Sequence, residues 1–109
     1  MLKIAPNVET DKLEKDIFVM LNTLANSLSF DITVTSGLRT EQENADVGGV
    51  PNSSHLRGLA CDIQCKSDLE RYKLINEILK TGFNRIGIAK DHLHLDIDPA
   101  KNSFRCWVE

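Results

Sequence analysis

Long hydrophobic runs and an excess of positive charge are both missing from this sequence. No apolar stretch in its 109 residues approaches the roughly 20 residues that a membrane-spanning helix requires. The formal net charge is -3, whereas nucleic-acid binding requires a clustered positive surface. We therefore expect no membrane span and no nucleic-acid partner, and we expect the chain to be a monomer.

Cysteines are few, and their number is odd. The chain has three, at positions 61, 65 and 106, and its first residues lack the apolar segment of a secretory signal. Both features favour reduced thiols and synthesis in the cytoplasm. The gap between Cys61 and Cys65 is one residue longer than in common zinc and redox motifs, so we interpret both as small buried thiols.

The length and composition are typical of one globular domain spanning residues 1–109. Hydrophobic residues make up 41% and charged residues 27% of the chain. Hydrophobic spacing predicts two helices, over about 10–28 and over 67–79. The second helix would have an apolar face of Leu69, Tyr72, Ile75, Ile78 and Leu79.

Outside the helices, alternating β-branched and apolar residues predict five strands: 30–35 and 59–63 between the two helices, and 85–89, 92–97 and 104–108 after the second. Residues 1–8 read as a short lead-in, and residues 36–57 as a long irregular loop of the kind that is usually functional. This order predicts an α+β domain with a mostly antiparallel sheet and with helices packed on one face.

Histidines are scarce as well, and all three lie in two short stretches. His55 precedes Asp62 by seven residues, with Gly58 between them, while His92 and His94 follow the turn residue Asp91. Two histidines and one carboxylate, with a fourth position left open, are the ligand set of a catalytic zinc ion. The candidate zinc (Zn²⁺) ligands are therefore His55, Asp62 and His94.

A hydrolytic zinc site also needs a base and groups that stabilise the transition state. Asp91, three residues before His94, is the candidate base. A two-residue period places His92 on the same strand face as His94, where it would hydrogen-bond the substrate or the tetrahedral intermediate. Arg39, in the long loop, is the candidate clamp for a substrate carboxylate or an oxyanion.

These stretches resemble the motifs of the zinc D-Ala-D-Ala peptidase family. All five fixed positions of the family signature match in Ser53-x-His55-x-x-Gly58-x-Ala60-x-Asp62. The second motif is similar to Asp91-His92-x-His94, and the segment that carries the family's active-site arginine resembles Ser36-Gly37-Leu38-Arg39. The resemblance covers residues 36–98. It implies a Hedgehog-like fold and the same metal ligands and catalytic residues as those given above.

The resemblance further implies a zinc metallopeptidase that hydrolyses peptidoglycan stem peptides, of the D-Ala-D-Ala carboxypeptidase or the phage endolysin type. Many members have Glu-x-Trp-His at the second motif, whereas this chain has Asp91 and Leu93, which places it nearer the His-x-His carboxypeptidase branch. The cleaved bond, D-Ala-D-Ala or L-Ala-D-Glu, stays open. Action at the cell wall after synthesis in the cytoplasm is consistent with phage-type release.

Two other functions also fit the residues: a zinc-stabilised binding module without hydrolysis, and a cysteine-dependent enzyme using Cys61 or Cys65. Single residues have structural interpretations too. Turns favour aspartate at any position such as 91, and Ser53 would cap the loop or support a ligand. Asp96 and Asp98 would either orient a ligand or lie at a solvated strand end. Trp107 would pack at the core edge or serve as a substrate platform.

Overall fold

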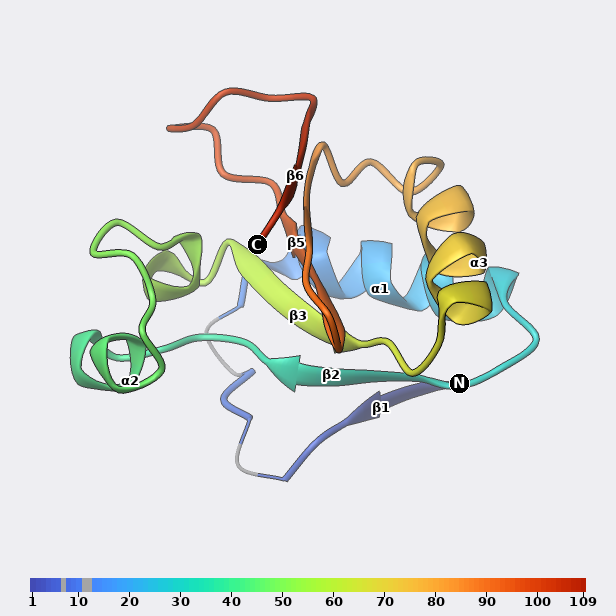
Figure 1. Cartoon of the computed structure of the whole chain (residues 1–109), viewed down its shortest axis with the longest axis horizontal. Coiled ribbons are helices and arrows are strands. Elements are labelled where there is room, and N and C mark those ends of the chain that lie inside the picture. Colours follow the sequence, from blue (N-terminus) through green and yellow to red (C-terminus); the bar gives the residue numbers. More distant parts are fainter. Residues whose placement is uncertain (7, 11–12) are drawn as a thin grey trace.

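The computed structural model describes residues 1–6, 8–10 and 13–109, which form one mixed six-stranded sheet with helices (Figure 1). In chain order, the strands are β1 (Leu2–Ile4), β2 (Ile32–Ser36), β3 (Ala60–Gln64), β4 (Arg85–Ile88), β5 (His92–Asp96) and β6 (Arg105–Val108). Their order across the sheet is β1-β2-β3-β5-β4-β6. The central pairings are antiparallel, whereas β1 and β6 pair in parallel at the two edges. The predicted α+β class with a mostly antiparallel sheet is confirmed.

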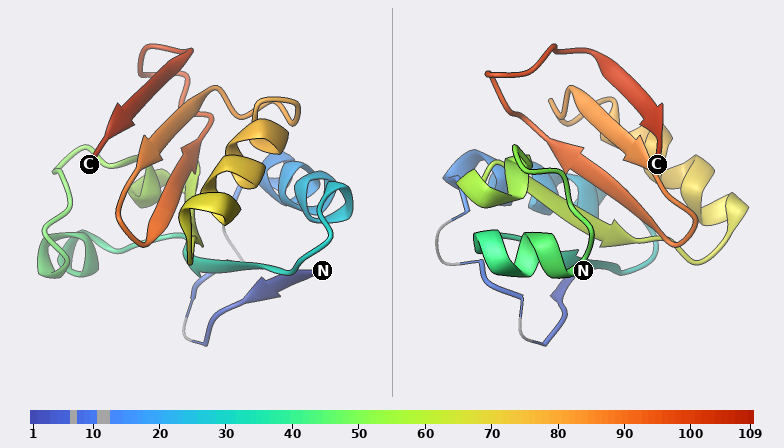
Figure 2. Two further views of the ribbon diagram at one scale, coloured as in Figure 1. Left: turned by 45° about the vertical axis from the view of Figure 1, so that its right-hand side comes forward. Right: turned by 60° about the vertical axis from the view of Figure 1, so that its left-hand side comes forward.

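Two long helices, α1 (Lys15–Ser27) and α3 (Asp68–Ile78), cover one face of the sheet. Figure 2 shows both on one side, with the short helix α2 (Glu41–Asp46) and the 3₁₀ turn η1 (Ser54–Arg57) on the other. The core lies beneath α1 and α3, where Ile17, Leu21 and Leu24 of α1 meet the strands. Burial of such side chains contributes roughly 1.5–3 kcal/mol each.

Strand alternation divides β3 and β5 between this core and the opposite face. Cys61 and Ile63 of β3 are fully buried in the core, as are Leu93 and Leu95 of β5. Because successive side chains in a strand point to opposite faces, Asp62 lies on the far side. It pairs in register with His94 of β5. The sheet thus separates a hydrocarbon core from a polar face.

Three local predictions differ from the structure. Residues 1–8, which were predicted to be an irregular lead-in, contain strand β1. This strand is too short to show alternation, and its backbone hydrogen bonds are made with β2. The long loop contains α2, which begins with a capping box between Thr40 and Glu43, a signal that the sequence already carried. Thr10 and Asp11 resemble a helix start, but helix α1 begins at Lys15, and Asp11 lies outside the described residues.

The apolar face predicted for α3 is also partly wrong. Leu74 and Ile78, one turn apart, are its buried residues, whereas Leu69, Tyr72 and Leu79 are largely exposed. A helix of this length buries only the stripe that faces α1 and the sheet, and its remaining apolar residues point to solvent.

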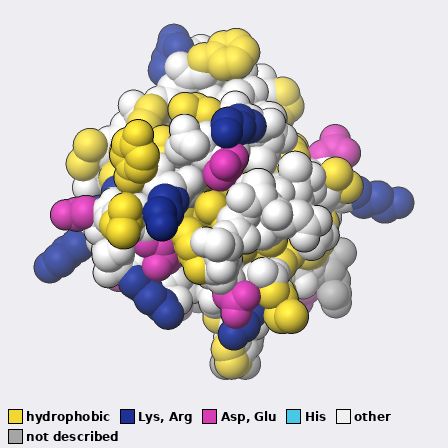
Figure 3. All heavy atoms as spheres, turned by 90° about the vertical axis from the view of Figure 1, so that its right-hand side faces the viewer, with side chains coloured by type: hydrophobic (Ala, Val, Ile, Leu, Met, Phe, Trp, Pro, Cys, Tyr) yellow, Lys and Arg dark blue, Asp and Glu magenta, His cyan; other side chains and the backbone are white. Residues whose placement is uncertain are grey.

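The outer surface on the α3 side carries hydrophobic side chains interspersed with basic and acidic ones (Figure 3). No histidine appears on this face, because all three point to the other side of the sheet. Within the described part of the chain, no helix combines the length and the apolar character needed to cross a bilayer.

Candidate metal centre

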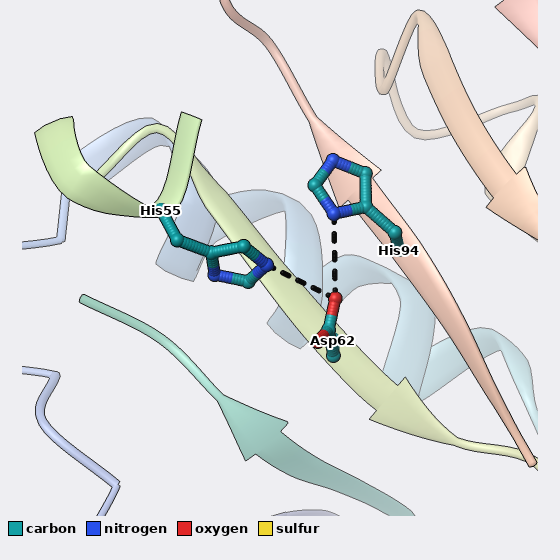
Figure 4. A group of neighbouring side chains, drawn as sticks. All are labelled: His55, Asp62 and His94. Carbon is teal, nitrogen blue, oxygen red and sulfur yellow. Dashed lines mark hydrogen bonds and ion pairs between the residues drawn. The ribbon is translucent and has the colours of Figure 1, made fainter. Parts of the chain in front are cut away.

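His55, Asp62 and His94 meet on the face of the sheet opposite α1 and α3. Figure 4 shows His55 reaching from η1, Asp62 rising from β3 and His94 from β5, with both imidazoles directed at the carboxylate. The Nε2 atom of His55 is 3.1 Å, and the Nδ1 atom of His94 is 3.4 Å, from Asp62 Oδ1. One ligand atom from each residue lies within 4.8 Å of the others. The predicted ligands are therefore brought together from three separate elements.

The remaining ring nitrogens establish which atoms are free to bind a metal. His55 Nδ1 donates to the Gly37 carbonyl at 2.8 Å, since a carbonyl oxygen can only accept. His94 Nε2 donates to Asp96 Oδ2 at 2.6 Å. In neutral imidazoles, His55 Nε2 and His94 Nδ1 are then bare lone pairs, and both face an oxygen of Asp62. Such a convergence of acceptors requires a cation or extra protons between them.

The spacing and type of these donors fit zinc. Bonds of about 2.0 Å in a tetrahedron separate the ligand atoms by about 3.3 Å. The two measured contacts to Asp62 Oδ1, 3.1 and 3.4 Å, bracket that value. Imidazole nitrogen with a carboxylate suits zinc, whereas calcium and magnesium prefer shells made of oxygen.

In the absence of a metal, the same contacts shift the protonation of the site. Burial acts to raise the pKa of Asp62, but hydrogen bonds with His55 and His94 outweigh it and hold that pKa far below its usual range. Burial acts to lower the pKa of His94, yet hydrogen bonds with Asp62 and Asp96 raise it to about 9. A proton on His94 then takes the place of a metal ion.

Asp96 supports His94 from behind. Its side chain is almost fully buried, accepts from the backbone N–H of Asp98, and forms an ion pair with Arg85 at 2.8 Å. A carboxylate that accepts the second N–H of a ligand histidine sets the tautomer and raises the basicity of the ring. Of the two interpretations of Asp96, the structure therefore supports ligand orientation, and a solvated strand end is excluded.

The η1 turn that carries His55 is secured at several points. Ser53 accepts from the His55 N–H and caps the turn, as one of its two interpretations predicted. Gly58 ends the turn with φ +69°, a conformation that favours glycine. The buried carboxylate of Asp98 accepts from Ser54 Oγ at 2.7 Å and pairs with Arg57, so it joins η1 to the end of β5. Asp98 therefore orients the loop that positions a ligand.

Arg39 contacts the candidate ligand Asp62. Its guanidinium donates to Asp62 Oδ2 at 3.1 Å, to Ser36 Oγ at 3.1 Å and to Asn44 Oδ1 at 3.4 Å. Only one carboxylate oxygen of Asp62 is left to face the two imidazoles. The structure thus brings Arg39 to the site, as predicted, in a position where it orients Asp62.

His92 and Asp91 form a pair at the edge of the site. His92 is 3.9 Å through Nε2 from Asp62 Oδ2, and its Nδ1 donates to Asp91 Oδ1 at 2.8 Å. That hydrogen bond lowers the pKa of Asp91. The Asp91 side chain is 86% exposed and does not line the cavity that holds the other candidates. The structure therefore brings His92 to the site and places Asp91 behind it.

A cavity of about 580 Å³ opens above the three ligands. Its walls include Arg39, His92 and several residues that sequence reasoning did not assign to the site: Val47, Val50, Arg85, Lys101 and Glu109. Trp107 also lines the cavity, so its alternative role as a substrate platform is consistent with its place. None of these residues belongs to either motif, and no local pattern indicated that they would meet there.

The cysteines lie away from this cavity. Cys61 and Cys65 are buried, as expected, and burial raises the pKa of both thiols. A thiol must ionise to act as a nucleophile, so neither residue suits a cysteine-dependent enzyme.

Comparison with known proteins agrees with this geometry. The sequence matches the family described as Peptidase M15 over residues 5–98, which includes both motifs and all three candidate ligands. No curated protein gives a significant match. The enzymes of the matched family are metal-dependent and typically use zinc. The chain therefore belongs to the Peptidase M15 family, the zinc D-Ala-D-Ala peptidases that its signature stretch resembles.

Proposed function

We propose that this metallopeptidase domain hydrolyses a peptide bond in peptidoglycan stem peptides, with zinc held by His55, Asp62 and His94. Membership of the Peptidase M15 family supports the enzyme class. The observation that carries the metal assignment is the convergence of two imidazole lone pairs on one carboxylate oxygen. The similarity of Asp91-His92-x-His94 to the carboxypeptidase branch supports the substrate, and the cell wall would be the site of action after phage-type release.

The protein groups around the metal site have distinct tasks under this proposal. Zinc, when bound, supplies a Lewis acid that polarises a peptide carbonyl and allows water to attack at neutral pH. Asp96 and the Gly37 carbonyl hold the two imidazoles in the ligating tautomer. Arg39 orients Asp62, and its place in the cavity wall also allows it to approach a developing oxyanion.

Proton transfer is assigned to Asp91 and His92 together. Asp91 accepts the Nδ1–H of His92. In the neutral ring, His92 Nε2 is then an acceptor at the cavity, 3.6 Å from Glu109 Oε2. A base must lie within hydrogen-bond reach of the proton that it removes, and metal-free geometry is often looser than that of the working complex. In the arrangement seen here, Asp91 acts through His92.

Digestion of purified sacculi by zinc-loaded protein tests the proposal. We expect about one zinc per chain and the release of new amino termini, whose identification by mass spectrometry assigns the cleaved bond. A chelator should abolish release and added zinc should restore it, while thiol alkylation should have no effect. The proposal is wrong if zinc-replete protein releases nothing from sacculi or from soluble muropeptides.

A zinc-stabilised binding module without hydrolysis is the second candidate. It is favoured by one observation, the exposure of the Asp91 carboxylate outside the cavity lining. Under this alternative, the protein would hold zinc and bind muropeptides while leaving them intact in the same assay.

A further inference from the structure

Trp107 is the only tryptophan of the chain, and its indole stands beside the metal site. The ring belongs to the edge strand β6 and lies 5.5 Å from the His94 ring, centre to centre, with a 52° tilt between their planes. It lines the cavity above the ligands and is only partly buried. A large apolar surface is thus presented next to the position where a bond would be cleaved.

The indole is held in place from below and from the side. Gly87 of β4 pairs in register with Trp107, and a Cβ atom at Gly87 would lie only 2.9 Å from Cε2 of the indole. The ring therefore rests on a backbone that has no side chain at this point. The Arg85 guanidinium lies 4.9 Å from the ring centre, in cation–π contact.

Arg85 is itself anchored, so it can fix the ring. It forms an ion pair with Asp96 at 2.8 Å and donates to the Asn102 carbonyl at 2.6 Å. Since Asp96 also accepts from His94, the indole and the ligand imidazole are positioned by one connected set of contacts. A wall that is ordered before the substrate arrives costs little entropy on binding.

Two valines add apolar surface to the same cavity from the α2 side. Val47 and Val50 flank the Gly48–Gly49 turn, and they are 66% and 58% exposed. Exposed aliphatic side chains that line a concave surface mark a binding site more often than a packing defect. Two cations of the cavity, Arg39 and Arg85, are already paired with Asp62 and Asp96. Lys101 and Glu109 also line the cavity, so the apolar part of its wall consists of Trp107 and these two valines.

We propose that Trp107 determines specificity by contacting the substrate side chain that adjoins the cleaved bond, and that it selects a small aliphatic group over a charged one. The inference rests on the proposed peptidase function and adds the chemistry of the accepted residue. Both candidate bonds, D-Ala-D-Ala and L-Ala-D-Glu, have an alanine on the acyl side. The methyl group of that alanine is the group that the indole would contact.

Kinetics with the stem pentapeptide L-Ala-D-Glu-L-Lys-D-Ala-D-Ala tests this assignment. The alanine on the acyl side of the cleaved bond is replaced by aspartate in a second peptide of the same length. We expect the zinc-loaded wild type to prefer the alanine peptide by about ten-fold or more in kcat/KM, the range for single groups in apolar pockets. Trp107→Ala should raise KM for the alanine peptide about ten-fold and reduce the preference, whereas Trp107→Phe should stay near the wild type.

Phe104→Ala provides the matched control. Phe104 is an exposed aromatic residue just before β6 that does not line the cavity, so its removal should leave KM and the preference unchanged. Wild-type KM and preference in Trp107→Ala would overturn the assignment. So would a loss of activity fully explained by weaker zinc binding, because Trp107 would then only pack against His94.

Tryptophan emission separates this inference from the proposed function. With one tryptophan in the chain, the emission of the zinc-loaded wild type reports contact at the wall even without turnover. We expect a saturable change with the alanine peptide, and the same change from the aspartate peptide only at about ten-fold higher concentration. Saturable binding without cleavage would refute the peptidase function and retain the role of Trp107. Cleavage without any change in emission would support the peptidase function and refute the role of Trp107.

Discussion

His94 donates its Nε2–H to Asp96 Oδ2 at 2.6 Å, and both residues line the cavity. This contact turns the Nδ1 lone pair of His94 toward Asp62. It also links the metal site to Arg85 and, through the cation–π contact, to Trp107. Asp96 therefore connects the ligands with the wall that would meet the substrate.

Replacing Asp96 should weaken zinc binding without removing a ligand. We expect Asp96→Ala to lower zinc affinity by about 10–100-fold, because the imidazole loses its fixed tautomer and Arg85 loses its partner. Asp96→Asn retains an oxygen that can accept from His94 and should lie between the wild type and Asp96→Ala. Competition with a chromophoric chelator measures both. Equal affinities for all three proteins would show that the contact has no role in metal binding.

Asp91 and His92 should behave as one unit in catalysis. Asp91→Ala should retain about one zinc per chain yet lose at least about 10²-fold in kcat, since it removes a proton-transfer group. His92→Ala should lose a similar factor in kcat. The double variant should have a kcat no lower than that of the less active single variant. His94→Ala, in contrast, should lose both zinc and activity. Retained activity in a folded Asp91→Ala protein would contradict the role assigned to this carboxylate.

The stability of the metal-free protein should fall as pH rises from about 6.5 to 9. The folded pKa of His94, about 9, lies above its usual value of 6.5. The protonated ring therefore stabilises the fold fully below pH 6.5, and this contribution is lost as pH passes through 9. Thermal melts in chelator at pH 6, 7.5 and 9 measure the trend, which His94→Gln should flatten. Zinc affinity should rise over the same range, since the ligand must lose that proton.

The buried Asp98 should contribute much more to stability than an exposed aspartate in the same kind of pair. Asp98→Ala leaves Ser54 Oγ and Arg57 without their partner, and we expect a cost of about 2–4 kcal/mol together with weaker zinc binding through η1. Asp68 pairs with Arg71 on the surface of α3 and provides the matched control. Asp68→Ala should change stability little. Denaturant unfolding measures the free energy of unfolding of both variants. Equal losses would contradict the importance of burial at Asp98.

A methyl group at Gly87 should displace Trp107. Gly87→Ala places a Cβ atom 2.9 Å from the indole and 2.5 Å from Glu109 Oε1, and we expect a loss of about 1–3 kcal/mol with a shift in tryptophan emission. Removing the ring should relieve most of this strain, so Gly87→Ala should cost less in a Trp107→Ala background. An equal loss of stability in both backgrounds would show that the added methyl group does not clash with the indole.

Much of the fold followed from local patterns. Alternation in 92–97 predicted both the strand and the face of His92 and His94, because side-chain direction in a strand depends only on the backbone period. Helix α3 begins where Ser67, followed three residues later by Glu70, predicts a helix cap, and the Ser67 hydroxyl accepts from the Glu70 N–H. Strand β1 and the buried stripe of α3 could not be predicted from local patterns, since each depends on the element that packs against it.

The chemistry of the site is readable from the chain alone: scarce histidines in two motifs, a carboxylate seven residues from one of them, and a glycine able to adopt the turn between. The geometry of the site comes from the folded arrangement. Strand order places Asp62 opposite His94, lets Arg39 reach Asp62 from the long loop, and lays Trp107 over Gly87. These contacts join segments that are far apart in the chain. Their distances depend on how the sheet pairs and packs, and no local period of the sequence carries that information.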